Sequence, residues 1–218
     1  MYKNKIDDNF HNYLVEGAGL VGDAGIPMLM QAKNAQVPNG LIPYNKAKKL
    51  VLRNRYIHFY LFDKYFNSIL TATKKNINLL KYYAGVITPD FSILIGQAKC
   101  LQETNTYFSR AVGFYLQKQG IPIIPNVRWG DKSTYDFCFL GIPKKSIVAI
   151  STHGCIQNKE LREIFKSGLY EMLNVIEPTD VVVHGSKAED IFEKYLKYTR
   201  FHFYPCWASE MLKNKGGD

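Results

Sequence analysis

Two stretches of the chain, 146–151 and 180–184, are almost purely apolar, and a segment with the pattern of one amphipathic helix lies between them. The first reads Ser-Ile-Val-Ala-Ile-Ser and the second Asp-Val-Val-Val-His, and residues 158–176 between them place apolar side chains at helical spacing. Continuous apolar strands that alternate with helices of about 10 to 20 residues are typical of a parallel sheet covered on both faces. This pattern constrains the fold most strongly and predicts an α/β protein.

The rest of the chain continues the alternation. Further strands are predicted at 25–29, 56–61, 85–88, 121–125 and 201–204, and further helices at 63–82, 104–119 and 188–198. Seven mostly parallel strands fit a small, irregular (β/α) barrel-like fold, and the alternative is an open doubly wound sheet. In either fold, polar residues that follow the strands meet at the carboxyl edge.

Length and composition limit the organisation. A chain of 218 residues with 46% hydrophobic residues can bury a full core, so we expect a single α/β domain over 21–218 after a poorly ordered arm over 1–20. The four cysteines show no disulfide spacing, and neither an export signal nor an apolar run of about 18 residues is visible. We therefore expect a cytoplasmic protein that does not enter a membrane. The oligomeric state stays open.

The residues that close the strands are rich in chemistry. They comprise candidate catalytic residues Asp90, Asp131, His153 and His184, and candidate binding residues Asn126, Arg128, Trp129 and Ser151. Carboxylates favour magnesium or manganese and imidazoles favour zinc, so a divalent metal is one expected cofactor. Arg128 could instead receive a phosphate or a carboxylate.

Simpler interpretations stand beside these. Asp90 after Pro89 could be a turn residue, Asp63 could cap a helix, and Trp129 could pack in the core. The nucleotide-binding, serine-hydrolase and metalloprotease motifs are absent from the chain. Whether the protein is an enzyme therefore stays open.

Positive charge is concentrated in one segment. The chain has a formal net charge of +9, and residues 33–81 hold ten basic residues against one acidic residue, Asp63. Nucleic acid or another polyanion is the expected partner of this segment because cations can contact phosphates, and in nucleic acid neighbouring rings can stack on bases. A solvated basic face without a ligand is the plain alternative. The expected contacts are Lys46, Lys48, Lys49, Arg53 and Arg55.

Three runs resemble a known family. They are Val-Ile-Thr-Pro-Asp-Phe-Ser (86–92), Ile-Pro-Asn-Val-Arg-Trp-Gly-Asp (124–131) and Val-Ala-Ile-Ser-Thr-His-Gly-Cys (148–155). They are similar to a domain of unknown function found in bacteria, their phages and mobile elements. The resemblance implies a phage or mobile-element setting and supplies no activity. Members of that family often carry a second acidic residue beside the position of Asp63, where this chain has Phe62.

Three hypotheses follow. The first is a phage or mobile-element protein associated with nucleic acid, with a processing activity at the carboxyl edge. The second is a small-molecule hydrolase assisted by a metal. The third is a non-catalytic inhibitor or adaptor that acts on a host protein.

Overall fold

The computed structural model describes residues 11–31, 35–50 and 52–215. Seven strands of these residues run parallel to their neighbours in chain order. They are β3 (Leu41–Pro43), β4 (Tyr56–His58), β5 (Gly85–Ile87), β6 (Ile123–Ile124), β7 (Ile147–Ser151), β8 (Asp180–His184) and β9 (Arg200–Tyr204). An isolated parallel bridge between Asn126 and Ala149 joins the four-stranded group to the three-stranded group.

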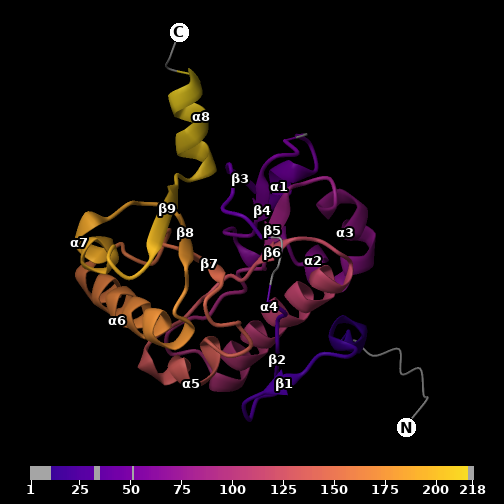
Figure 1. The fold of residues 1–218 in the computed structure, drawn as a ribbon, viewed down its shortest axis with the longest axis horizontal. Coiled ribbons are helices and arrows are strands. Elements are labelled where there is room, and N and C mark those ends of the chain that lie inside the picture. Colours follow the sequence, from indigo (N-terminus) through magenta and orange to yellow (C-terminus); the bar gives the residue numbers. More distant parts are fainter. Residues whose placement is uncertain (1–10, 32–34, 51, 216–218) are drawn as a thin grey trace.

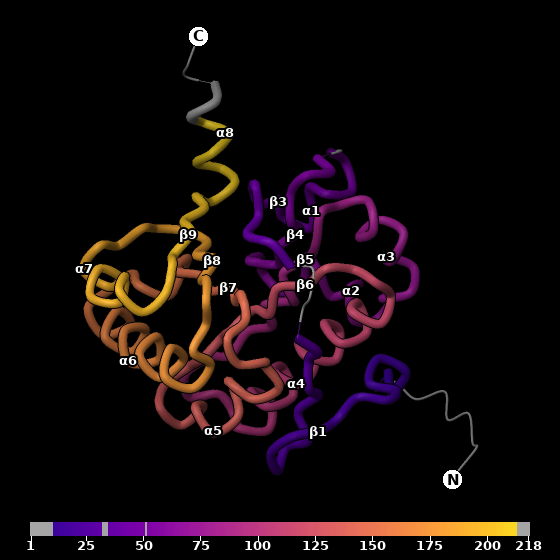
Figure 2. The backbone as a smooth tube through the Cα atoms, viewed as in Figure 1, coloured from indigo at the N-terminus to yellow at the C-terminus, as the bar shows by residue number. Residues whose placement is uncertain are grey.

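Most helices connect consecutive strands and cover their outer side, whereas η1 precedes the strands and α8 follows the last one and projects away from them (Figure 1). They are η1 (Asn12–Val15), α1 (Tyr44–Ala47), η2 (Asp63–Tyr65), α2 (Ser68–Thr71), α3 (Thr73–Leu80), α4 (Lys99–Lys118), η3 (Lys132–Thr134), α5 (Tyr135–Cys138), α6 (Lys159–Ile176), α7 (Glu189–Phe192), η4 (Glu193–Tyr195) and α8 (Trp207–Lys215). Figure 1 shows the strands along a curve, with α2 and α3 outside one arm and α6 and α7 outside the other. Figure 2 traces the backbone from β6 through α5 to β7.

The curve is barrel-like but open. Strands β9 and β3 form no ladder among the described residues, and the Tyr204 hydroxyl instead donates to the Pro38 carbonyl at 2.5 Å. A doubly wound sheet would reverse its strand order at a switch point, and this array keeps chain order from β3 to β9. The α/β class and the barrel-like arrangement predicted from the sequence are confirmed, without closure of the barrel.

Alternation along each strand explains why the runs are apolar throughout. In β8, Val181 and Val183 pack outward against α6 and α7, while Val182 points to the interior cluster. That interior cluster takes apolar residues from every strand of the curve: Leu41, Tyr56, Ile87, Ile124, Ala149, Val182 and Tyr204. Both faces of these strands are therefore buried. Their sequences consequently lack the alternation of apolar and polar residues that is typical of a half-exposed sheet.

Several predicted elements differ from the structure. Residues 26–27 form β2, which pairs antiparallel with β1 (Leu20–Val21) outside the curve, and the first parallel strand is β3, which was not predicted. The helix predicted over 63–82 is divided into η2, α2 and α3. In the predicted arm, residues 1–10 lie outside the described residues, whereas η1 packs on α4 and buries Leu14.

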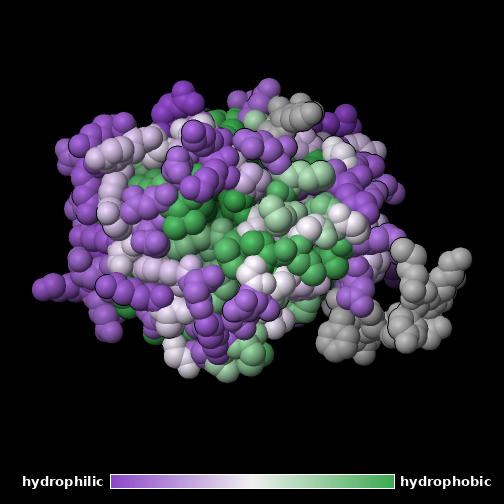
Figure 3. Space-filling model, turned by 60° about the horizontal axis from the view of Figure 1, so that its bottom comes forward, coloured by the Kyte–Doolittle hydropathy of each residue, from purple (hydrophilic) through white to green (hydrophobic). Residues whose placement is uncertain are grey.

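Two further features of the molecule concern apolar character, first along the helices and then on one face of the surface. Among the described residues, no helix combines the length and the apolar character that crossing a bilayer would require. Figure 3 turns the bottom of Figure 1 toward the reader and shows apolar residues gathered on that face, with polar residues around them.

Candidate functional site at the carboxyl edge

A chain of polar contacts crosses the carboxyl ends of β4 to β9, and we call it the carboxyl-edge network. Asn126 is its centre, because its amide donates to Asp90 Oδ1 at 2.7 Å and accepts from the Tyr60 hydroxyl at 3.0 Å. Arg128 approaches the other Asp90 oxygen at 3.4 Å. Asp90 follows β5, and Asn126 and Arg128 follow β6, so the parallel order of the strands brings them together.

Tyr60 links this half of the network to the histidines. Its ring stacks on His184 with centroids 4.7 Å apart, and His58 lies 4.6 Å from the same imidazole. Ser151 Oγ lies 3.1 Å from His184 Nδ1, and the His153 backbone N–H donates to that hydroxyl at 3.2 Å. The network thus includes Asp90, Asn126, Arg128, Ser151, His153 and His184 of the residues predicted from the sequence.

Burial sets the protonation of the network. Desolvation lowers the pKa of His184 from 6.5 to about 4 and the pKa of His58 well below its usual value, with a further lowering from the neighbouring imidazole in each case. Burial also raises the pKa of Asp90, which Arg128 and Asn126 partly offset. At neutral pH the His58 and His184 imidazoles are therefore neutral, whereas Arg128 is charged.

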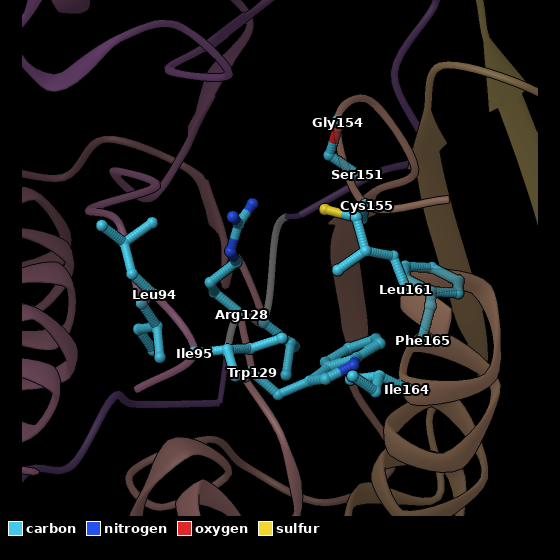
Figure 4. Close-up of a pocket in the computed structure, with 13 residues that line it drawn as sticks. Leu94, Ile95, Arg128, Trp129, Ser151, Gly154, Cys155, Leu161, Ile164 and Phe165 are labelled. Carbon is cyan, nitrogen blue, oxygen red and sulfur yellow. The ribbon is translucent and has the colours of Figure 1, made fainter. Parts of the chain in front are cut away.

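A cavity of about 290 Å³ opens beside the network (Figure 4). Its polar lining includes Arg128, Ser151 and Cys155, and its remaining wall is largely apolar. Burial raises the pKa of the Cys155 thiol, and the nearby Arg128 only partly opposes this shift. Cys155 is consequently a neutral thiol at pH 7, which does not favour a role as nucleophile.

Two further predicted site residues make their contacts outside the network. Asp131 caps η3, where its carboxylate accepts from the Ser133 backbone N–H at 2.9 Å and from the Ser133 hydroxyl at 2.5 Å. Within the described part of the chain, its carboxylate forms no hydrogen bond or ion pair with a member of the network. Trp129 packs against Phe139 and Phe165, and a Cβ at Gly168 would meet its indole, so this glycine lets the ring lie against α6. Trp129 is a wall of the cavity and part of the core.

Metal binding needs donors that converge. Within the residues that the structure describes, no group of three or more His, Cys, Asp or Glu side chains is placed to hold a metal ion. Asp63, the other carboxylate near this edge, accepts from Ser92 through both its oxygens instead of capping a helix with its side chain. The donor set expected for a divalent metal is therefore not assembled at this edge.

Sequence reasoning missed Tyr60 as a site residue and Cys206, whose sulfur lies 3.4 Å from His153 Nδ1. Both follow the ends of parallel strands, by two residues in each case. The rule that selected Asp90 and Arg128 would have selected Cys206, whereas Tyr60 lay inside the strand predicted over 56–61. The apolar wall of the cavity carries no such signal, because its members come from a loop and a helix that are distant in sequence.

The predicted basic contacts lie elsewhere. Arg55 directly precedes β4 and Tyr83 lies two residues before β5, so this surface belongs to the amino ends of the strands. Arg55 is not free for a ligand, because it pairs with Glu210 at 2.7 Å and donates to the Leu41 carbonyl. Lys46, Lys48, Lys49 and Arg53 are exposed. Lys33 of the basic segment lies outside the described residues.

Comparison with known proteins gives a family. A family model described as "Domain of unknown function (DUF4417)" matches residues 19–204. The "Gene 1 protein" of Mycobacterium phage L5 is 36% identical over 129 residues, which are 59% of this chain and 56% of that protein. The "Gene 1 protein" of Mycobacterium phage D29 is 31% identical over 156 residues, 68% of this chain and 58% of that protein. No solved structure matches.

The chain spans somewhat more than half the length of these curated relatives. The region matched by the family model, residues 19–204, contains all seven parallel strands and the whole carboxyl-edge network apart from Cys206.

Proposed function

Because the chain belongs to the DUF4417 family, whose description assigns no activity, we propose a function from its own surface: association with single-stranded nucleic acid through the side that carries α1 to α3. The setting proposed is a phage or a mobile element, in line with the two mycobacteriophage relatives. The observation that supports the proposal most strongly is a basic surface whose cations have no carboxylate partner among the residues that the structure describes.

Eight exposed cations share this property. They are Lys46, Lys48, Lys49, Arg53, Lys64, Lys74, Lys75 and Lys81. Among the described residues, none of the eight has a carboxylate within 4.0 Å, and Asp63 is the single acidic residue between 35 and 83. Unpaired cations gain most from phosphates, since binding releases condensed counterions without breaking an internal ion pair.

A groove of about 340 Å³ within this surface supplies a place for a base. Lys48, Lys49 and Arg53 line it together with Tyr82 and Tyr83, and we call it the basic groove. Tyr82 is 60% exposed, and the Arg53 guanidinium lies 5.4 Å from its ring centroid. An exposed ring beside a cation is the arrangement on which unpaired bases stack.

Tyr83 makes the groove rigid. Its hydroxyl donates to the Ala47 carbonyl at 2.8 Å and also contacts the Leu50 carbonyl, which ties the segment after α1 to the end of α3. The lysines at 48 and 49 are therefore held beside Tyr82 before any ligand binds. A preformed groove lowers the entropic cost of binding.

The test measures the anisotropy of a fluorescent 20-nucleotide oligothymidylate as protein is added at several salt concentrations. The variant Lys48→Ala/Lys49→Ala/Arg53→Ala should bind at least about 10-fold more weakly at low salt. Its log–log salt slope should be shallower by about 2, at about 0.7 for each phosphate contact of a single strand. Lys159→Ala/Lys194→Ala/Lys197→Ala is the matched control, because it removes the same charge from exposed positions near α6 and η4.

Equal loss in the two triple variants would mean that only net charge matters and would contradict the assignment of the groove. Absence of oligothymidylate binding at low salt would overturn the proposal altogether. Tighter binding of a duplex of equal length would contradict the choice of a single strand.

A further inference from the structure

The cavity at the carboxyl edge is independent of the basic groove and has a different character. Figure 4 shows the Arg128 side chain between Leu94 on one side and Cys155 on the other. The apolar wall is formed mainly by Leu94, Ile95, Trp129, Leu161, Ile164 and Phe165. One cation thus stands at the polar end of an otherwise apolar cavity.

Arg128 has donors to spare. Its only hydrogen-bond partner among the described residues is Asp90, at 3.4 Å through a single nitrogen. Its Nε is buried and has no partner there. A guanidinium carries five N–H donors in a fixed fork, and a buried donor without a partner costs about 1 to 3 kcal/mol. A ligand in the cavity cannot reach an atom as fully buried as Nε, so it must accept from the terminal nitrogens Nη1 and Nη2, of which only Nη1 contacts Asp90 among the described residues.

The wall indicates what the rest of the ligand must be. Leu94 and Ile95 are 54% and 46% exposed although they border the cavity, so they present apolar surface at its opening. Leu161 and Phe165 belong to the first turns of α6, which follows β7 as the helix of a βαβ crossover. A volume of about 290 Å³ is near the lower end for small-molecule sites, which bind apolar bodies oriented by a few polar groups.

We propose that this cavity binds a monocarboxylate carried on an apolar body, with the carboxylate on Arg128. A carboxylate matches the planar fork of a guanidinium in a bidentate manner. A phosphate monoester has the same attraction to Arg128, but its second negative charge would face Asp90, which already lies 3.4 Å from the guanidinium. Ser151, whose hydroxyl is held by His184 and the His153 backbone, supplies a second polar group at the same end.

The test uses octanoate and 3-phenylpropanoate as probes, with octanol, octylamine and octyl phosphate as comparisons. Alkylation of Cys155 by N-ethylmaleimide at pH 9 is followed by peptide mass spectrometry, because Cys155 lines the cavity and Cys100 is exposed outside it. At least one carboxylate should slow labelling of Cys155 several-fold and leave labelling of Cys100 unchanged. Octanol and octylamine should protect at least about 10-fold less well at equal concentration.

Two variants place the site. Arg128→Gln should weaken carboxylate binding, measured by calorimetry, at least about 10-fold. Ile95→Glu puts a like charge at the opening and should have a similar effect without disturbing the core, since Ile95 is 46% exposed. Leu101→Glu is its control, because Leu101 is 51% exposed on α4 and does not line the cavity.

The proposal is overturned if neither carboxylate protects Cys155, if octanol protects as well as octanoate, or if Ile95→Glu and Leu101→Glu behave alike. Preference for octyl phosphate over octanoate would refute the monocarboxylate and identify a phosphate site. Arg128→Gln should leave oligothymidylate binding unchanged, so this proposal and the nucleic-acid proposal can fail separately.

Discussion

The two ends of the parallel strands differ in how their charged side chains are placed: those at the carboxyl edge are largely buried and paired, and those of the basic groove at the amino ends are exposed. At the carboxyl edge, each charge has a specific neighbour: Asp90 contacts Asn126 and Arg128, and the buried histidines are kept neutral. At the amino ends, the cations of the basic groove are exposed and lack carboxylate partners among the described residues. The structure of the carboxyl edge therefore depends on individual contacts, whereas the basic groove would attract a ligand through the summed charge of its cations.

Fold geometry accounts for the difference. The carboxyl ends of β4 to β8 converge on the interior of the curve, so side chains placed there lose water and must find partners. The segment from α1 to β4 and the end of α3 lie on the outside, where water screens each charge. Substitutions at the carboxyl edge should therefore change folding stability, and substitutions of the exposed cations in the basic groove should change ligand binding far more than stability.

The largest effect on folding stability is expected at Arg110 of α4, a buried cation that contacts the backbone of Asn126 at the carboxyl edge. Its guanidinium donates to the carbonyls of Leu140, Asn126 and Cys138 at 2.9 to 3.1 Å. Burial lowers its pKa to about 10, so it stays charged at pH 7. Arg110→Met should lower the free energy of unfolding in urea by about 3 to 5 kcal/mol, because three buried carbonyls lose their partner.

Arg53→Met is the matched control, since Arg53 is an exposed arginine of the basic groove. It should change the free energy of unfolding by less than about 0.5 kcal/mol. Equal losses in the two variants would show that the contrast between the two ends is wrong.

The next largest effect is the pH dependence contributed by His184. Its pKa is about 4 in the folded chain and about 6.5 in the unfolded chain, so between these values the unfolded state binds more protons. Stability should be full above pH 6.5 and should fall by about 1.4 kcal/mol per unit as the pH decreases, or roughly 3 kcal/mol by pH 4. The buried His58 acts in the same direction, and the raised pKa of Asp90 opposes it.

His184→Asn isolates the histidine term. An asparagine amide can keep a contact with Ser151 Oγ but does not titrate. Urea unfolding at pH 7, 6, 5 and 4 should show a shallower loss of stability in the variant than in the natural chain. Superimposable pH profiles would contradict the assignment of a depressed pKa to His184.

A smaller effect is expected at Asn126, which joins the two halves of the network. Asn126→Ala leaves the Tyr60 hydroxyl and one oxygen of Asp90 without their present partner, at a cost of about 2 kcal/mol. It should also raise the pKa of Asp90 further, because the amide stabilises the carboxylate. Urea unfolding and the carboxyl ¹³C shift of Asp90 measure the two effects. Asn54→Ala, at an exposed position before β4, should show neither.

The sequence predicted most reliably the elements whose signal is local. β7, β8 and α6 match their predicted ranges closely, because apolar runs mark the strands and Asn158 caps the helix by accepting from the Leu161 N–H. β3 was missed because it has three residues and ends in a proline, which reads as a turn.

The predicted helix over 63–82 breaks because side chains satisfy the backbone at the interruption. The Asn76 amide donates to the carbonyls of Ser68 and Ala72, and the Thr73 hydroxyl donates to the Ile69 carbonyl. Apolar spacing does not reveal this competition. Most members of the network could be predicted because they follow strands. The contact of Asp131 with Ser133 and the apolar wall of the cavity could not, since strand ends give no signal for either.

The smallest effect is expected where the basic groove loses charge without losing structure. In Lys48→Ala/Lys49→Ala/Arg53→Ala, the free energy of unfolding at 0.15 M salt should change by less than about 0.5 kcal/mol, as expected for exposed positions. At low salt it should rise slightly, since the removed cations repel their neighbours and have no carboxylate partner to lose among the described residues. Urea unfolding at the two salt concentrations measures this. A loss of stability above about 1 kcal/mol would mean that these cations hold the segment after α1 in place. Weaker oligonucleotide binding by this variant would then reflect a disturbed groove and not the loss of phosphate contacts.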